Sequence, residues 1–200
     1  MLLGALLFAQ GGTHPGIEVR NGKTSLRLTP TMRQALDRYD RTFRLWNYDE
    51  FANWVRQGLP PNDRAALSAI LGDFNGDHLP DLVLNGRTRQ DGVIVVLLSD
   101  SAGYRAVEVS RWPGDTSASG MSADVPGRDT YLVPTPAGSI DLPIFDPADS
   151  AWTALDYESP APAQRILRLH NDAFSVNFEE KGGALCVYAK GRFWWIVSGD

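Results

Sequence analysis

The sequence predicts an α+β protein in which helices near the start precede a mainly antiparallel, β-rich domain. Apolar residues between positions 32 and 43 recur at helical spacing. Beyond position 66, short apolar runs instead alternate with turns containing Gly, Asn or Asp, as in sheets of short strands. Two hundred residues, of which 43% are hydrophobic and 22% charged, suffice to bury one core. We therefore expect a single domain over residues 13–200.

The N-terminal part of this domain predicts a hairpin and two helices. Residues 16–28 surround an Asn-Gly turn at positions 21 and 22, which is typical of a β-hairpin. Thr29 and Pro30 then predict a helix start, because Pro is favoured at the first helical position. Asn47 and Glu50 have the spacing of a capping box and predict a second helix with apolar positions 51, 54 and 55. The arginines between the apolar positions of the first helix indicate a solvated face.

The rest of the chain predicts strands. The run that starts at Asp81 predicts a short buried strand ending in an Asn-Gly turn at positions 85 and 86, and residues 93–98 predict the next strand. A turn at positions 100–103 leads to a third strand at 105–109. Residues 111–164 are rich in Gly, Pro, Ser, Thr and Asp, so we expect surface loops with short strands near 131 and 140. Four strands between 165 and 197 predict an antiparallel meander whose last turn is Lys190-Gly191.

The loop between Gly72 and the strand at 81 is the most informative stretch for function. Oxygen-bearing side chains stand at alternate positions, and a backbone carbonyl lies between them: Asp73, Asn75, Asp77, the Leu79 carbonyl and Asp81. Calcium takes several oxygen ligands at about 2.3–2.6 Å, and such spacing lets a tight loop surround the ion. Three nearby carboxylates repel one another, and a divalent cation removes that repulsion. The loop predicts a site for one Ca²⁺; the alternative is an acidic surface turn without an ion.

The loop and the strands after it resemble one FG-GAP/VCBS-type repeat, the integrin-α-like calcium unit with the signature G-D-F-N-G-D-G-x-x-D-L-V. An EF-hand does not fit, because the acidic residue required at position 12 of its loop is Leu84 here. The resemblance covers about residues 66–109 in a single copy, and it implies that the four side chains and the Leu79 carbonyl bind calcium. His78 stands where the family has Gly, which predicts a strained or weaker loop.

Other catalytic and metal motifs are missing from the sequence. The lone Cys186 excludes an intramolecular disulfide and lies in an apolar run, which predicts a buried structural thiol. The three histidines, His14, His78 and His170, lack zinc-type spacing to other ligands. No G-x-S-x-G elbow, phosphate-binding glycine loop or H-E-x-x-H motif occurs. These observations favour binding over catalysis.

Charge and the first residues bear on partners and compartment. The net charge of −5, without a dense basic run, argues against nucleic acid and anionic membranes as partners. Residues 1–12 resemble the apolar part of a truncated secretory signal segment, and they are too short to span a bilayer. The alternative for them is an apolar first strand. The signal interpretation predicts a secreted or periplasmic protein.

Together these observations predict an exported calcium-binding protein that acts as a non-enzymatic interaction module with a structural calcium loop. We expect its partner to be a protein or a glycan, contacted through the loops at 111–164. Two alternatives remain at this point: a calcium-stabilised hydrolase with an unrecognised active site, and a periplasmic inhibitor or immunity-type protein.

Overall fold

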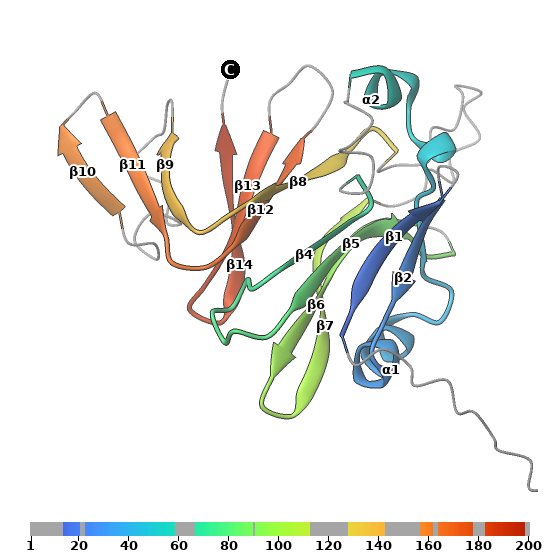
Figure 1. Ribbon diagram of the computed structural model, residues 1–200. Helices are drawn as coiled ribbons and strands as arrows, with labels where there is room; N and C mark the ends of the chain where they lie inside the picture. The colour runs from blue at the N-terminus through green and yellow to red at the C-terminus, as the bar shows by residue number, and fades with distance from the viewer. Residues whose placement is uncertain are drawn as a thin grey trace, which may run out of the picture.

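The computed structural model describes residues 14–20, 23–58, 67–89, 91–112, 128–142, 157–161, 164–177 and 183–198. These ranges contain fourteen strands, two short α-helices and one 3₁₀ turn, and every described strand pairing is antiparallel (Figure 1). The protein is therefore β-rich, as predicted, but the described part of the chain holds only two short α-helices, so the α+β class is confirmed only for its β-rich part. The predicted signal segment, the Asn-Gly turn at 21–22 and most of the expected loops at 111–164 lie outside the described residues.

A five-stranded sheet forms the centre of the molecule. Its path is β3 (Arg44–Leu45), β5 (Asp81–Arg87), β6 (Gly92–Asp100) and β7 (Gly103–Trp112), and β4 (Ala69–Gly72) pairs with the same edge of β5 as β3. Nearly all of β5 and β6 is buried because both faces of this sheet are covered. This double burial explains why the predicted strand at 93–98 is a continuous apolar run without polar alternation.

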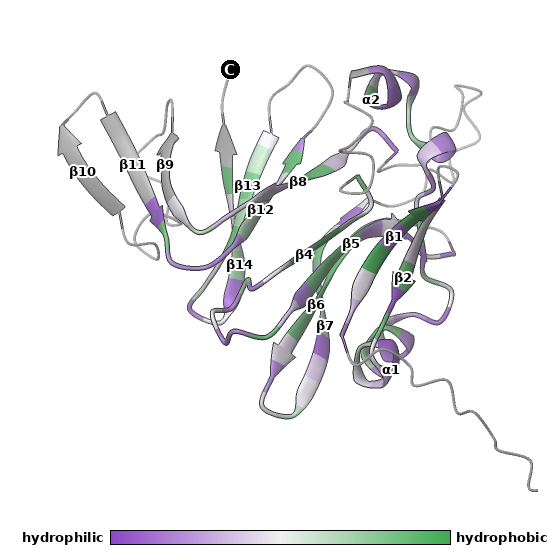
Figure 2. Ribbon diagram, viewed as in Figure 1, coloured by the Kyte–Doolittle hydropathy of each residue, from purple (hydrophilic) through white to green (hydrophobic). Residues whose placement is uncertain are grey.

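The second sheet packs against one face of the central sheet. Its order is β14 (Arg192–Ser198), β13 (Gly183–Ala189), β12 (Ala173–Asn177) and β8 (Tyr131–Thr135). Apolar side chains of the two sheets meet in one core, coloured green where they lie on these strands in Figure 2. The core members are Ile70, Phe74, Val83, Ile94, Val96, Leu98, Leu132, Phe174, Val176 and Cys186. Cys186 is buried and unpaired, as predicted.

The opposite face of the central sheet is covered by α1 (Pro30–Tyr39) and by the hairpin of β1 (Gly16–Arg20) and β2 (Lys23–Arg27). Met32, Ala35 and Leu36 are buried against the central strands, which confirms the predicted apolar face. The Thr29 hydroxyl accepts a hydrogen bond from the Met32 amide at 3.2 Å, so Thr29 caps the helix directly before Pro30. The predicted helix start is therefore confirmed.

A smaller core lies under the 3₁₀ turn at Tyr48–Glu50 and α2 (Asn53–Gly58). The predicted capping box is present, because Glu50 Oε2 accepts a hydrogen bond from the Asn47 amide at 2.9 Å. It begins the 3₁₀ turn, however, and α2 starts only after Phe51. The buried members of this core are Trp46, Phe51, Val55 and Leu67. No described helix is long and apolar enough to cross a membrane.

Two sequence predictions are wrong in detail. The strand predicted at 165–169, β11 (Gln164–Leu169), does not join the C-terminal meander, because it pairs with β9 (Gly138–Leu142) and β10 (Tyr157–Ala161) in a separate sheet. Asn85-Gly86 is not a turn but the continuation of β5. A Cβ at Gly86 would lie 2.3 Å from the Arg44 carbonyl oxygen, so glycine is needed where β3 passes.

Candidate metal centre

The predicted calcium loop connects β4 to β5 and is closed by strand pairing, since Gly72 and Asp81 are partners in the antiparallel register. Two residues of the loop have left-handed backbone conformations, Gly76 with φ 79° and His78 with φ 64°. A residue with a Cβ is strained in this region. The structure therefore confirms that His78 stands at a position where glycine is preferred.

Three of the predicted ligands fold back onto amides of the loop itself. Asp73 Oδ1 and Oδ2 accept hydrogen bonds from the Gly76 and His78 amides at 2.7 and 2.9 Å. Asn75 Oδ1 accepts from the Asp77 amide at 3.0 Å, and Asp77 Oδ1 accepts from the Leu79 amide at 2.9 Å. These Asx-type turns fix the loop from within.

The fourth ligand, Asp81, is fully buried, with an exposed fraction of 0%, and it opens β5. Its Oδ2 accepts from the Phe74 amide at 2.9 Å, and its Oδ1 accepts from the Ser99 amide at 2.7 Å. The Ser99 hydroxyl lies 2.6 Å from Asp81 Oδ1 and 2.8 Å from Asp77 Oδ2. A single hydroxyl thus stands between two carboxylates, one from the middle of the loop and one from its end.

Sequence reasoning missed Ser99, which lies on β6, 18 residues after Asp81. The position follows the apolar run 93–98 and precedes the Asp100 turn, so its local pattern indicates only the end of a strand. Its role depends on the pairing of β5 with β6. The sequence could identify Ser99 only if this strand register were already known, because the register places the end of β6 beside the start of β5.

The two bridged carboxylates differ in acidity. Burial raises the pKa of Asp81 above its ordinary value, although hydrogen bonds from Ser99 and Phe74 oppose the rise. For Asp77 the burial effect is outweighed by hydrogen bonds from Leu79, Ser99 and Asn75, together with the charge of His78, so its pKa is lowered. The His78 Nδ1 atom lies 3.4 Å from Asp73 Oδ2, and the His78 side chain is 93% exposed.

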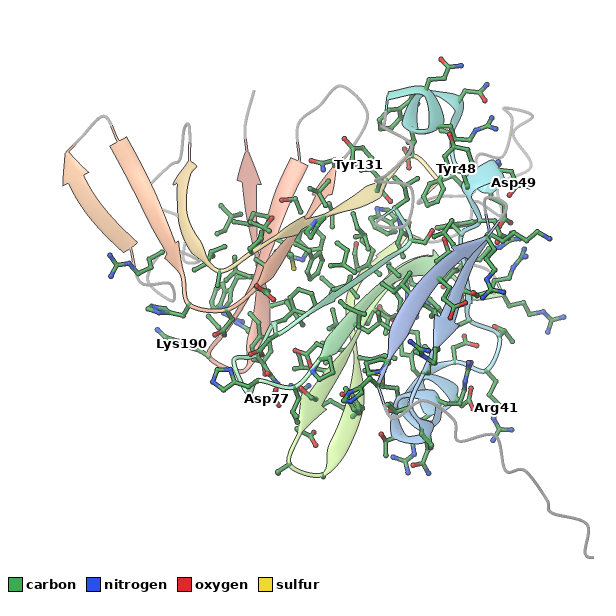
Figure 3. The ribbon with its side chains drawn as sticks, viewed as in Figure 1. Arg41, Tyr48, Asp49, Asp77, Tyr131 and Lys190 are labelled. Carbon is green, nitrogen blue, oxygen red and sulfur yellow. The ribbon has the colours of Figure 1, made fainter. Side chains whose placement is uncertain are left out.

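The loop, in which Figure 3 labels Asp77, also contacts the turn between β11 and β12. The Asp73 amide donates to Asp172 Oδ2 at 3.0 Å, and the Asp172 amide donates to the Asp73 carbonyl at 3.0 Å. Asp172 Oδ1 accepts from the Ala137 amide at 3.1 Å, and Asn171 Nδ2 donates to the Phe74 carbonyl at 3.3 Å. The loop therefore sits where the central sheet meets the second sheet.

The donor set of the loop fits calcium by chemistry, since it offers carboxylate and amide oxygens, which this hard cation prefers. The arrangement of these side chains is held by internal hydrogen bonds: Asn75 Nδ2 donates to the Ser99 carbonyl at 2.7 Å and to Asp77 Oδ2 at 3.2 Å. In the part of the chain that the structure describes, no three or more His, Cys, Asp or Glu residues are grouped so that they could hold a metal ion. Asn75, Asp77 and Asp81 meet at Ser99, whereas the Asp73 carboxylate faces Gly76 and His78.

The loop is thus a compact acidic turn that links β5, β6 and the Asn171-Asp172 turn. Its side chains offer carboxylate and amide oxygens, and its hydrogen bonds join the central sheet to the second sheet. Comparison of the chain with protein-family models, with curated proteins and with solved structures found no match.

Proposed function

We propose that the protein is an exported calcium-binding protein, a non-enzymatic interaction module in which one Ca²⁺ stabilises the loop from Asp73 to Asp81. The observation that carries this proposal is the Asp77–Ser99–Asp81 arrangement. Two carboxylates share one hydroxyl proton, and the His78 imidazole of the same loop lies beside a third carboxylate, Asp73, at 3.4 Å. A divalent cation at this place would neutralise both charges.

The ion would be held by Asp73, Asn75, Asp77, Asp81 and the Leu79 carbonyl, in agreement with the FG-GAP/VCBS-type repeat that the loop resembles. Because these side chains are hydrogen-bonded to the loop and to Ser99, binding requires some of them to turn. That rearrangement lowers affinity and suits the weak sites of extracellular proteins, which fill at about 10⁻⁴–10⁻³ M calcium. An exported protein meets such concentrations, so the proposed compartment and the proposed ion are consistent.

The ion's role would be structural. A ligand that binds only the folded state stabilises it by about 2.7 kcal/mol when present at a hundredfold excess over its Kd. The loop joins β4 to β5 and contacts the Asn171-Asp172 turn, so stabilising the loop also stabilises the junction of the two sheets. Calcium would then keep the binding surfaces of the module in place without touching a partner.

The hydrolase alternative is less well supported. Ser99 is the hydroxyl closest to the acidic groups, but it is 1% exposed and donates to carboxylates, so a substrate cannot reach it. Two surface hollows lie along α1, and none of the described residues that line them belongs to the loop. These observations favour a binding protein, whether it acts as an adaptor or as an inhibitor.

Calcium titration by calorimetry, combined with thermal melting, tests the proposal. With about 10 mM calcium, a hundredfold excess over a Kd of about 10⁻⁴ M, we expect binding heat and a rise in Tm of about 5–10 °C, from 2.7 kcal/mol and the usual dependence of Tm on free energy for this chain length. Asp77→Ala should abolish both effects. Asp37→Ala, which removes an exposed carboxylate of α1, should retain them. A parent protein that shows neither heat nor a Tm rise overturns the calcium proposal.

A further inference from the structure

Positive charge gathers in one part of the chain. Residues 14–45 contain seven Lys or Arg and three Asp or Glu, although the whole chain has a net charge of −5. In the structure these residues form the β1–β2 hairpin and α1, which cover one face of the central sheet (Figure 1), and β3, a strand at the edge of that sheet. This face is therefore basic on an acidic protein.

A groove with a volume of about 280 Å³ lies between β2, α1 and β3. Its apolar side chains are Leu26, Leu36, Phe43 and Leu45, and the exposed Arg33 and Arg44 stand beside them. None of the described residues that line it is acidic, although Arg44 Nη2 lies 3.7 Å from Glu50 Oε1, outside the groove. We call it the arginine groove.

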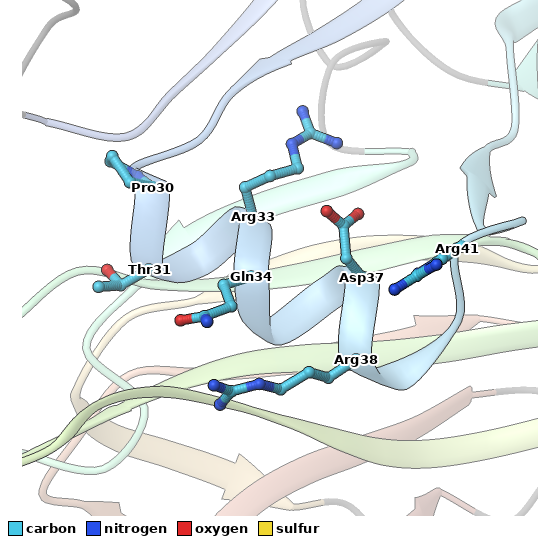
Figure 4. A pocket seen from close by; sticks show the side chains of 7 residues that line it. All are labelled: Pro30, Thr31, Arg33, Gln34, Asp37, Arg38 and Arg41. Carbon is cyan, nitrogen blue, oxygen red and sulfur yellow. The ribbon is translucent and has the colours of Figure 1, made fainter.

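The arginine groove adjoins a second, larger hollow on the outer face of α1. This hollow has a volume of about 680 Å³, and Figure 4 shows its lining side chains from close by. Three of them are arginines, Arg33, Arg38 and Arg41, and one is acidic, Asp37. Because Arg33 lines both hollows, the basic surface extends from the groove along the helix.

The strand that borders the groove has an open edge. Among the described strands, β2 pairs only with β1, and β1 in turn lies against β4. Because only two residues connect Arg20 to Lys23, these two residues form the hydrogen-bonded pair that closes the hairpin. Such pairs alternate in antiparallel ribbons, so the backbone groups of Thr24 and Leu26 point away from β1, toward the open edge.

We propose that the arginine groove binds an extended acidic segment of a partner protein, which adds as a third strand beside β2. Backbone hydrogen bonds to Thr24 and Leu26 would supply affinity, as in other cases of strand addition. An apolar side chain of the segment would enter among Leu26, Leu36, Phe43 and Leu45, while its carboxylates pair with Arg33 and Arg44. Nucleic acids and sulfated glycans match the charge, but they use neither the apolar floor nor the strand edge.

This inference names the partner class of the proposed interaction module, and so it rests on that part of the proposed function. It does not depend on calcium, because the groove and the loop share no residue. Peptide binding is therefore measured both in calcium and in a chelator. If the protein binds calcium with measurable heat but does not bind the peptide, only the groove proposal is wrong. If it binds the peptide but shows no calcium heat, only the calcium proposal is wrong.

Fluorescence anisotropy with the full chain tests the charge requirement. The probe is a labelled synthetic peptide, Glu-Val-Glu-Ile-Glu-Val, and the comparison probes are Glu-Ser-Glu-Ser-Glu-Ser, a dT oligonucleotide and a heparin hexasaccharide. The Arg33→Glu/Arg44→Glu protein should bind the first peptide at least about tenfold more weakly, and added salt should weaken parent binding. Arg105→Glu/Arg192→Glu, with the same change in net charge on exposed side chains of β7 and β14, should stay within about twofold. Equal binding of the serine peptide, the oligonucleotide or the hexasaccharide overturns the proposal.

A second pair of variants tests strand addition. Thr24→Pro removes an outward-pointing amide without removing a hydrogen bond of the hairpin, and Thr24→Ala keeps that amide. The proline variant should lose at least about tenfold in peptide affinity, while its melting temperature stays close to that of Thr24→Ala. The Thr24→Ala variant should bind the peptide within about threefold of the parent. A proline variant that is folded and binds normally overturns strand addition at β2.

Discussion

His78 and Ser99 determine the state of the acidic loop at the residue scale. His78 adopts a backbone conformation with φ 64°, which glycine tolerates better, and Ser99 places one hydroxyl between Asp77 and Asp81. The first property was predictable from the sequence, because the loop pattern requires a sharp turn at His78. The second was not, since it arises from strand pairing. The loop therefore combines a local conformational cost with a long-range hydrogen bond.

Replacing His78 by Gly should raise the free energy of unfolding by about 0.5–1 kcal/mol, because the positive φ then carries no Cβ strain. The exposed His78–Asp73 pair that is lost contributes little. Urea denaturation at pH 7.5 measures the change. Lys190→Gly is the matched comparison, since Lys190 is the other non-glycine residue with positive φ among those described, at 51°. The strain argument would be contradicted if Lys190→Gly raised the free energy of unfolding while His78→Gly left it unchanged or lowered it.

At the scale of elements, a polar network connects α1 to the edge strand β7. The Tyr39 hydroxyl donates to Glu108 Oε2 at 2.6 Å, and Arg111 donates to both Glu108 oxygens, at 2.6 and 3.0 Å. The Arg111 hydrogen bonds lower the pKa of Glu108 most, partial burial opposes them, and the Tyr39 hydroxyl lowers the pKa further. The network therefore depends on an ionised carboxylate.

This network predicts a pH dependence of stability. Because the folded-state pKa of Glu108 lies below its ordinary value of 4.5, its contribution is complete above that pH and is lost as the pH falls through the folded-state pKa. Glu108→Gln should therefore flatten the fall of Tm between about pH 4.5 and pH 2. Glu18→Gln, which removes an exposed carboxylate from the hairpin, serves as control. An identical acid profile for Glu108→Gln and the parent would refute the role of the network.

Elements that depend on local sequence were predicted well, and those that depend on pairing were not. Thr29-Pro30 and the apolar run at 93–98 define α1 and β6 by themselves. Asn85-Gly86 has the composition of a turn, yet it remains a strand because β3 passes against Gly86. β11 has an ordinary strand composition that does not specify whether it pairs with β12 or with β9 and β10. For the same reason, the loop acids were predictable from their spacing, whereas Ser99 and Asp172 were not.

At the scale of the whole molecule, Asp172 joins parts that are far apart in the sequence. Its two carboxylate oxygens accept hydrogen bonds from the Asp73 and Ala137 amides, and Asp73 is 99 residues away. Phe74 and Phe174 pack edge to face beside this link, with ring centroids 5.5 Å apart. The central and second sheets are therefore joined by both polar and apolar contacts.

Asp172→Ala should destabilise the protein by about 2–3 kcal/mol, because it leaves two amides without their acceptor, and Tm should fall by about 5–10 °C. Asp172→Asn keeps one acceptor oxygen and should lose less. Hydrogen exchange gives a local readout, since the amides of Asp73 and Ala137 should lose protection while those of α1 keep it. Unchanged protection of both amides in Asp172→Ala would show that the link does not hold the sheets.

The Asp73–Asp172 link has a consequence for the newly made chain. Asp172 follows Asp73 by 99 residues, so the Asp73–Asp172 link cannot form when the acidic loop is first synthesised. The Asp73 amide and carbonyl therefore remain bound to water until the β11–β12 turn has been synthesised. A chain cut short before His170 would contain every residue of the cation-site pattern and still lack the partner that anchors it.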